Sequence, residues 1–379
     1  MYITRMMFIR AILCVVSAFM VSASGEDRRA RFDDWSKEFA MRFENNDHTD
    51  KVFSTWLEND DYITLRNEQN LTYTLGHNQF SGMDGDEFTR YLGLSARSGV
   101  SNKAAQYHPD LFQSKVSHAK CMVNCVKHVE DECTLDTVKC IRGCKDESTL
   151  QAAESVDWVS KGAVTDVKNQ GQCGSCWSFS TTGALEGANF VKHNTLVSLS
   201  EQQLVDCDNL QNGGRDHGCN GGLMDNAFTW IEKNGGLCQE ASYPYISGET
   251  KKAGTCMTDC DAVSGTAIAD YYDVPSNSDD DMMTALNKQP VSIAIQADQK
   301  DFQLYNSGVF TGDCGTQLDH GVLVVGYGSM DGNDYYRVKN SWGTSWGKDG
   351  YIYLGRGSQY NSGSGQCGML MQGSYPEVE

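Results

Sequence analysis

Apolar residues recur at roughly helical spacing after residue 176, at Phe179, Ala184, Leu185, Ala188 and Val191. This pattern predicts a helix that begins near residue 176. A second helix is predicted over residues 223–234, because the glycine pair at 235–236 ends its pattern. A third apolar helix should follow the Ser-x-x-Gln capping box that starts at Ser200.

Short apolar runs bounded by glycine dominate the last third of the chain and are typical of buried strands. They cover residues 291–296, 320–327, 335–339 and 351–354. Residues 32–95 are instead charged, with a helical pattern. After residue 150 the predicted helices therefore come first and the predicted strands second.

The first 23 residues have the features of a secretory signal peptide. Arg5 and Arg10 precede an apolar stretch over residues 11–21, and the small residues Ser22 and Ala23 follow it. The stretch is too short for a membrane anchor, and we expect no other segment to span a bilayer. Passage through an oxidising compartment would suit the 15 cysteines of the chain.

Composition narrows the choice of partners. The chain has 379 residues, enough for two ordinary domains, and 40% of them are hydrophobic, enough for real cores. Its formal net charge of −19 argues against nucleic acid as a partner, because nucleic-acid-binding proteins present a basic surface. We expect neither a nucleic-acid partner nor a membrane partner.

Cys176 lies in the run 169–179, Asn-Gln-Gly-Gln-Cys-Gly-Ser-Cys-Trp-Ser-Phe. A cysteine attacks a carbonyl only as a thiolate, and the N-terminus of a helix lowers the pKa of a thiol placed there. An isolated cysteine in a cysteine-rich secreted chain is usually half of a disulfide. The surrounding motif instead favours a nucleophile.

A cysteine nucleophile needs a base, an orienting group for the base and donors for the oxyanion. His320 begins a glycine-bounded apolar run 144 residues after Cys176 (320 − 176), and Asn340 stands in Val-Lys-Asn-Ser-Trp-Gly. Gln170, six residues before Cys176, can direct a side-chain N–H beside the backbone N–H of that cysteine. Alone, these residues would be read as a core histidine, a turn asparagine and a loop glutamine.

Together these residues resemble the papain-like cysteine peptidases, most closely the cathepsin L-like branch. The segments 200–207 (Ser-Glu-Gln-Gln-Leu-Val-Asp-Cys) and 218–222 (Gly-Cys-Asn-Gly-Gly) also stand as in that family, and the resemblance covers about residues 32–379. It implies an α+β fold of two lobes, with a helical lobe carrying Cys176 and a β-barrel-like lobe carrying His320. The cleft between the lobes would be the active site.

The resemblance also implies substrate-binding residues. Gly221 and Gly222 would let a substrate backbone lie close to the enzyme. Trp342 and Trp346 would shield the His320–Asn340 hydrogen bond and line the leaving-group side of the cleft. The main specificity pocket would be formed by Leu223, Met224, Ala294 and Leu318, with Gln372 at its floor. Such a pocket prefers a bulky hydrophobic residue two positions before the scissile bond.

Disulfides carried over from the family are Cys173–Cys219, Cys207–Cys256 and Cys314–Cys367. Cys238 and Cys260 remain in one lobe, and we expect them to form a fourth bridge. Cys176 is then left unpaired.

The segment 99–149 has no counterpart in the family pattern. Cysteines four residues apart share one helix face, so a helical hairpin would pair Cys121 with Cys144 and Cys125 with Cys140. Cys133 would lie in the turn, free or in an intermolecular bridge. A metal site is the alternative, but zinc ligands are more often two residues apart, so we expect no metal.

Residues 24–98 resemble the inhibitory propeptide of the family, with Trp56, Asn59, Ile63 and Asn67 at its helix spacing. Three positions depart from the pattern: His48 and Val52 replace Glu and Arg, and Gly82 replaces Asp. Residues 76–80 stand as Gly-His-Asn-Gln-Phe. The sequon at Asn70 predicts a glycan that is lost on maturation.

The predicted order is a signal peptide (1–23), an inhibitory propeptide (24–98), a cysteine-rich connection (99–149) and a peptidase domain (150–379). The resemblance implies a monomeric cysteine endopeptidase made as a zymogen, acting on proteins and peptides without a cofactor. We expect it in a lysosome or vacuole, or outside the cell. The alternatives are a silent homologue that binds peptides in its cleft and a secreted scaffold built on the cysteine-rich segment.

Overall fold

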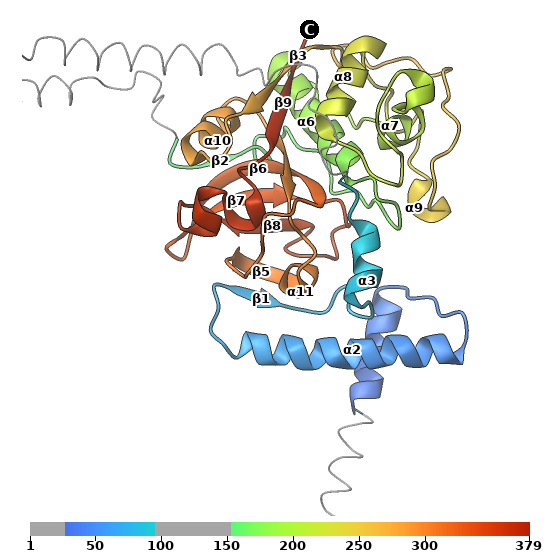
Figure 1. Cartoon of the computed structure of the whole chain (residues 1–379), viewed down its shortest axis with the longest axis vertical. Helices are drawn as coiled ribbons and strands as arrows, with labels where there is room; N and C mark the ends of the chain where they lie inside the picture. Colours follow the sequence, from blue (N-terminus) through green and yellow to red (C-terminus); the bar gives the residue numbers. More distant parts are fainter. Residues whose placement is uncertain (1–26, 95–152) are drawn as a thin grey trace, which may run out of the picture.

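The computed structural model describes residues 27–94 and 153–379 (Figure 1). The expected signal peptide and the whole segment 99–149, with its five cysteines, therefore lie outside the described residues. None of the described helices is long and apolar enough to cross a membrane.

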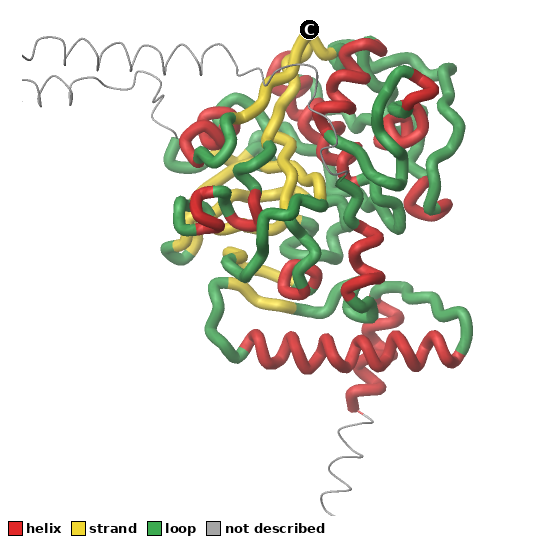
Figure 2. The backbone as a smooth tube through the Cα atoms, in the orientation of Figure 1, coloured by secondary structure: helices red, strands yellow, loops and turns green. Residues whose placement is uncertain are grey.

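Helices and strands separate into two regions after residue 153, as Figure 2 shows. The helical region contains α6 (Cys176–His193), α7 (Glu201–Cys207), η2 (Leu210–Asn212), α8 (Met224–Asn234) and α9 (Ser247–Thr250). The strand region also carries α10 (Asp279–Leu286), α11 (Lys300–Gln303), η3 (Tyr360–Gly363) and η4 (Gln366–Gly368).

The described strands form one sheet in the order β1-β5-β8-β7-β6-β4-β9-β3, and β2 also pairs with β6. Their pairings are antiparallel except for β5 with β8. Their bounds are β1 Tyr73–Leu75, β2 Val156–Asp157, β3 Ile268–Val274, β4 Val291–Ile295, β5 Tyr305–Phe310, β6 His320–Met330, β7 Asn333–Lys339, β8 Tyr351–Gly355 and β9 Gly373–Val378.

Helix α6 joins the two regions, because it packs directly against the sheet. Ser180 Oγ donates to the Val322 carbonyl at 2.7 Å, and Ser292 Oγ donates to the Ser180 carbonyl at 2.8 Å. Gly183 and Gly187 permit the close approach: a Cβ at Gly183 would lie 2.8 Å from a Leu323 methyl carbon. The nucleophile helix is thereby held against the strand that begins with His320.

The prosegment, residues 27–94, begins with a helix over residues 27–38 that crosses α2 (Asn46–Asn67) (Figure 1). Strand β1 then adds to the edge of the sheet by pairing with β5. The short helix α3 (Gly85–Phe88) and the turn η1 (Thr89–Tyr91) lead toward the junction of the two regions. The prosegment therefore contacts both the helical region and the strand region of the domain that follows it in the chain.

The residues at the propeptide spacing have identifiable structural roles. Trp56 and Ile63 are buried, and Asn59 Nδ2 donates to the Ser81 carbonyl at 2.8 Å. The side chain of Asn67 donates to the Leu75 carbonyl at 2.9 Å and accepts from the Leu75 N–H at 2.8 Å. The two asparagines therefore tie α2 to the chain that returns beside it.

The departures Val52 and Gly82 fit one another. A Cβ built on Gly82 would lie 2.5 Å from Val52 Cγ1 and 2.9 Å from the Trp35 ring. An aspartate at residue 82 would therefore clash with the apolar side chains beside it. His48 stands at the start of α2, where its backbone N–H donates to the Asn45 side chain and its Nδ1 accepts from the Glu44 N–H at 3.2 Å.

Two sequence predictions about local structure need correction. The capping box at Ser200 is only half formed: Ser200 Oγ accepts from the Gln203 N–H, but Gln203 Oε1 accepts from the Cys238 N–H instead of closing the box. The strand pattern also missed β3, β5 and β9, because polar residues, glycine or proline interrupt the apolar residues of these strands.

Candidate active site

Cys176 occupies the first position of α6 and is fully buried. It is the unpaired cysteine among the described residues. Its sulfur accepts hydrogen bonds from backbone N–H groups, including that of Gly321 at 3.3 Å. Because Gly321 directly follows His320, this hydrogen bond places the first residue of α6, Cys176, next to the first residues of β6.

His320 is held by a polar and an aromatic contact. Its Nε2 and the Asn340 Oδ1 are 2.8 Å apart, and the indole of Trp342 stacks on the imidazole with 4.6 Å between ring centroids. Asn340 Oδ1 also accepts from the Ser341 N–H at 2.8 Å. The oxygen of Asn340 therefore favours the tautomer with a proton on Nε2 and leaves Nδ1 as the basic nitrogen.

Gln170 is positioned at both ends of its amide. Its Oε1 accepts from Ser341 Oγ at 2.7 Å, and its Nε2 donates to the Cys173 carbonyl at 2.9 Å and to the Tyr91 carbonyl at 2.8 Å. Tyr91 belongs to the prosegment. A prosegment carbonyl therefore occupies a donor that could otherwise stabilise an oxyanion.

Burial suppresses the charged forms of the nucleophile and the base. Burial raises the pKa of the Cys176 thiol to about 11, although backbone N–H donors from Gly321, Gly93 and Trp177 act in the opposite direction. Burial also lowers the pKa of His320 to about 4, against the effect of Asn340. A neutral thiol beside a neutral imidazole is the expected state at neutral pH.

After the turn η1, the prosegment residues 92–94 run through the cleft as an extended backbone. Gly222 donates its N–H to the Gly93 carbonyl at 3.1 Å, and Leu94 donates to the Asp319 carbonyl at 3.0 Å. Leu94 pairs with Gly222 in parallel fashion. Both lobes thus bind this segment through backbone groups, which any peptide sequence can offer.

Gly93 passes very close to the enzyme backbone. A Cβ at this position would collide with Gly174, and its own N–H donates to the sulfur of Cys176. An amide N–H, and not a carbonyl carbon, therefore faces the nucleophile. This geometry blocks attack on the prosegment while filling the position that a substrate would need.

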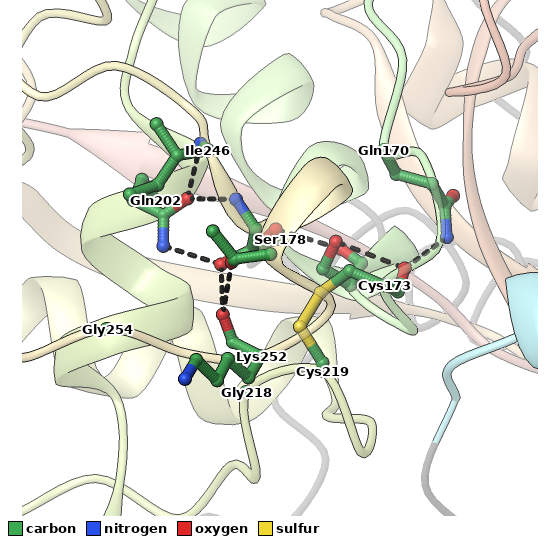
Figure 3. The surroundings of a disulfide bond; sticks show 12 residues. Gln170, Cys173, Ser178, Gln202, Gly218, Cys219, Ile246, Lys252 and Gly254 are labelled. Carbon is green, nitrogen blue, oxygen red and sulfur yellow. Dashed lines mark hydrogen bonds between the residues drawn. A yellow bond between two sulfur atoms is a disulfide. The ribbon is translucent and has the colours of Figure 1, made fainter.

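The described residues contain four disulfides, Cys173–Cys219, Cys207–Cys256, Cys238–Cys260 and Cys314–Cys367. These are the pairs that the sequence suggested for this region. Figure 3 shows the Cys173–Cys219 bridge close to Gln170. The bridge joins the loop before Cys176 to the glycine-rich segment that binds Gly93.

A pocket of about 80 Å³ contains three of the five predicted specificity residues, Leu223, Met224 and Gln372. Ala294 adjoins it through its N–H, which donates to the Gln372 carbonyl at 3.0 Å. Leu318 does not line this pocket; it lies against Gly368. A role for Leu318 in substrate binding therefore stays a prediction.

Two carboxylates in the same pocket were not anticipated. Asp225 and Asp273 line it beside Gln372, and Asp225 Oδ1 accepts from Ser374 Oγ at 2.7 Å. Asp225 directly follows Met224, so the sequence offered a signal there. Asp273 comes from β3, a strand that the hydrophobic pattern did not predict.

The two tryptophans are fully buried while the prosegment is bound. The Trp342 carbonyl accepts from Gln79 Nε2 at 2.6 Å, and its ring packs edge-on against Phe80 and Phe88. Trp346 packs on Trp342 with 5.0 Å between ring centroids. The prosegment therefore covers the side of the cleft predicted for the leaving group.

Asn70 is exposed in the turn between α2 and β1, where a glycan has room. Thr72 of the same sequon donates its hydroxyl to the Val309 carbonyl at 2.6 Å. Modification of Asn70 stays a prediction.

Comparison with known proteins agrees with this architecture. The sequence model of the papain family cysteine protease matches residues 152–377. The sequence model of the cathepsin propeptide inhibitor domain (I29) matches residues 32–88. The chain therefore belongs to the papain family of cysteine proteases and carries the family's inhibitory prodomain.

Individual relatives include plant proteases. The chain is 42% identical to the probable cysteine protease RD21B of Arabidopsis thaliana over 328 residues. These aligned residues cover 86% of this chain and 61% of RD21B. It is 40% identical over 353 residues to the KDEL-tailed cysteine endopeptidase CEP2 of the same plant, covering 93% of this chain and 87% of that one. The chain thus spans about three fifths of the length of RD21B.

Solved precursors share the fold. A recombinant stem bromelain precursor aligns with a TM-score of 0.72 at 34% identity and covers 93% of this chain and 99% of its own. Digestive procathepsin L 3 of Tenebrio molitor larval midgut aligns with a TM-score of 0.71 at 32% identity, covering 92% and 98%. The α+β papain-like fold with a bound prosegment is therefore shown.

Proposed function

We propose that this chain is the zymogen of a cysteine endopeptidase that hydrolyses peptide bonds with Cys176, His320, Asn340 and Gln170. The observation that carries the proposal is the connected hydrogen-bond arrangement around Cys176: His320 bonds to Asn340, and Gln170 is held by Ser341, the next residue. The family membership of both matched segments supports it.

Removal of the prosegment would admit water and substrate to Cys176 and His320. The burial that raises the pKa of the thiol and lowers that of the imidazole would then end. With burial relieved, the position of Cys176 at the start of the 18-residue helix α6 favours the thiolate. Proton transfer from sulfur to His320 Nδ1 would give the reactive ion pair.

The thiolate sulfur attacks the carbonyl carbon of the scissile peptide, and the carbonyl electron pair moves to oxygen. Gln170 Nε2 and the backbone N–H of Cys176 donate to this oxyanion. The C–N bond then breaks as His320 gives its proton to the leaving amine, which leaves a thioester on Cys176. His320 next takes a proton from water, whose oxygen attacks the thioester carbonyl carbon. The C–S bond then breaks, the acyl group leaves as a carboxylic acid that ionises in solvent, and Cys176 returns as the thiolate beside protonated His320.

We propose a preference for a bulky hydrophobic residue two positions before the scissile bond. Leu223 and Met224 supply apolar surface for such a side chain. Peptides that differ only in leucine, phenylalanine or arginine at that position test this preference. A higher kcat/KM for arginine would show that Asp225 and Asp273 dominate the pocket and would contradict the preference.

Secretory routing, with a lysosomal, vacuolar or extracellular destination, is proposed from the apolar N-terminal stretch and the disulfides. The prosegment is proposed to act as the inhibitor of its own enzyme, because residues 91–94 fill the cleft. The mature enzyme is proposed to work as a monomer on protein substrates.

The decisive experiment acidifies the purified precursor under mild reduction and follows intact mass together with cleavage of a Phe-Arg reporter peptide. Wild-type protein should lose its N-terminal part and become active, whereas Cys176→Ala should stay silent even when another protease clips its prosegment. A wild-type protein that also remains silent after clipping would contradict the proposal.

A further inference from the structure

A cavity of about 540 Å³ lies on the helical side of the domain, and none of the residues described above as binding the prosegment lines it. It is formed by the segment before Gln170, by α6, by the start of α7 and by the loop that carries Glu240 and Tyr245. Its volume is within the range of small-molecule sites in proteins. The catalytic cycle proposed above does not use it.

Its lining is acidic. Asp166, Glu201 and Glu240 contribute carboxylates, and Lys168 contributes the one ammonium group among the lining residues. The ammonium is already engaged: Lys168 Nζ donates to Glu201 Oε1 at 2.6 Å, to Glu186 Oε1 at 3.2 Å and to the Leu199 carbonyl at 2.9 Å. The lining therefore has more negative charge than its lysine neutralises.

Two carboxylate oxygens in this lining have no hydrogen-bond partner among the described residues. Glu201 is 1% exposed; its Oε1 accepts from Lys168 and from Thr182, but its Oε2 has no donor. Glu240 Oε1 accepts from the Tyr245 N–H at 2.9 Å, and its Oε2 is likewise buried without a donor. Buried acceptors of this kind are rarely left unsatisfied.

The remaining walls are apolar and aromatic. Phe179 and Tyr245 stand edge to face with 4.9 Å between ring centroids, and Leu196 contributes a side chain that is 37% exposed. Aromatic faces and aliphatic surface stabilise the body of an organic cation while carboxylates receive its N–H groups. A hydrated inorganic cation would gain nothing from these walls.

We propose that this cavity binds a small organic cation, an amidinium, guanidinium or primary ammonium group on an apolar body. The charged group would donate to Glu201 Oε2 and Glu240 Oε2, and the apolar body would lie against Phe179 and Tyr245. The site is separate from the substrate cleft, and its occupation does not depend on the peptidase activity.

The charged groups around Glu201 set the pH dependence of this binding. Burial raises the pKa of Glu201 to about 7; Lys168 lowers it, and the charges of Glu186 and Glu240 raise it further. The buried Lys339, whose pKa burial lowers to about 8, and the rim carboxylate Asp166 face the same cluster. Because the cation needs an ionised Glu201, affinity should rise as the pH increases through about 7.

Two contacts link the cavity to the catalytic residues. Tyr245 donates its hydroxyl to the Gln170 carbonyl at 2.8 Å and lies 2.7 Å from Ser175 Oγ. Glu201 also lines a small cavity of about 20 Å³, which it shares with Asn340 and Ser341. A ligand in the acidic cavity would therefore contact Tyr245, which supports Gln170, and Glu201, which shares the small cavity with Asn340.

Calorimetric titration of full-length Cys176→Ala with benzamidine tests the proposal, because the prosegment still closes the substrate cleft in that protein. We expect saturable binding at pH 8 that is about tenfold or more tighter than for benzamide, its neutral analogue. Binding should weaken at pH 5.5, where Glu201 is protonated.

Substitutions at the cavity test whether benzamidine binds there. Glu240→Gln should weaken benzamidine by about tenfold, and Ser198→Lys should abolish binding by placing a competing ammonium at the cavity. The exposed Glu249, which does not line the cavity, provides the matched control, Glu249→Gln, with unchanged affinity. The proposal is wrong if benzamidine gives no saturable heat at pH 8, or if both Glu240→Gln and Ser198→Lys bind it as well as the parent does.

Discussion

The prosegment and the peptidase domain are stabilised in different ways. The first half of the prosegment has a small core of its own, made of Phe32, Trp35, Val52 and Trp56. Its second half has none: Phe80, Phe88 and other apolar residues there pack into the large core of the peptidase domain. All four disulfides of the described residues lie in the peptidase domain.

This difference indicates how the inhibitor can leave without harming the enzyme. The prosegment depends on contacts across the interface, such as Asn78 Nδ2 with the Gln303 carbonyl at 2.8 Å and Gln303 Nε2 with the Phe80 carbonyl at 2.9 Å. The peptidase domain has cross-links that constrain its unfolded chain. Conditions that loosen the interface should therefore release the prosegment long before the domain unfolds.

The largest expected effect concerns chemistry, which this account assigns wholly to the peptidase domain. Cys176→Ala should lower kcat/KM of the processed enzyme by about 10⁴-fold or more, because no other described thiol is free to attack. Steady-state kinetics measure the loss, and thermal unfolding of the same protein checks its fold. Retention of a tenth of wild-type activity by a folded variant would contradict the assignment.

The next effect concerns the cross-links. Replacing Cys314 and Cys367 together by serine should lower the free energy of unfolding of the processed domain by about 2–5 kcal/mol. Denaturant titration with and without reducing agent measures the change. The comparison fails if the double variant and the parent unfold at the same denaturant concentration under oxidising conditions.

Asp301 provides the strongest polar anchor of the prosegment on the peptidase domain. Its carboxylate accepts from Tyr62 at 2.6 Å, from Arg66 Nε at 3.1 Å and from the Tyr73 hydroxyl. Asp301→Asn should speed zymogen activation by about tenfold or more, because hydrogen bonds to a charged group contribute about 1.5–3 kcal/mol. Asp298→Asn, whose carboxylate accepts from Gln296 and Gln299 of the same loop, is the matched control.

The sign of the pH effect at Asp301 follows from its pKa. Burial alone would raise the pKa of Asp301, but its donors Arg66, Tyr62 and Tyr73 outweigh burial, and the pKa is lowered. The ionised carboxylate therefore stabilises docking at every pH above about 4, and this contribution is lost only in stronger acid. Release of the prosegment in mild acid must therefore depend on a group other than Asp301.

The smallest expected effect concerns His77, a prosegment residue whose protonation in mild acid would weaken docking. Burial lowers the pKa of His77 despite its contact with Asp60, and Arg31 lowers it while Glu38 raises it. The imidazole stacks on Trp56, and its Nδ1 is buried without a partner among the described residues. Because the folded prosegment favours neutral His77, the prosegment fold that docks on the domain loses stability as the pH falls below about 6.5.

His77→Gln removes this proton-binding group. The pH midpoint of zymogen activation should fall by about half a unit, measured as processing rate against pH. His48→Gln is the matched control, since His48 is only half-buried at the start of α2. An unchanged midpoint in His77→Gln, or an equal shift in both variants, would show that His77 is not the group that responds.

The sequence was most informative where short motifs determine local chemistry. The run around Cys176, the spacing to His320 and the segment around Asn340 predicted residues that lie in one buried cluster. The fold class followed from the same resemblance. These features depend on residues close in sequence or on motifs with fixed roles.

The features that the sequence did not reveal depend on contacts between distant segments. Nothing near Asp301 indicates that Tyr62 and Arg66, more than 230 residues earlier, donate to it. Strand β1 exists because the edge of β5 is available for pairing. Val52 and Gly82 looked like departures in isolation, and only their packing shows that each accommodates the other.

The central claim is that the prosegment keeps Cys176 as a buried, neutral thiol. Alkylation with iodoacetamide at pH 7, followed by mass mapping of the peptide that contains Cys176, tests it before and after acid processing. The account predicts negligible labelling of Cys176 in the precursor and labelling at least about 100-fold faster after processing. Equal labelling rates in the two forms would contradict it.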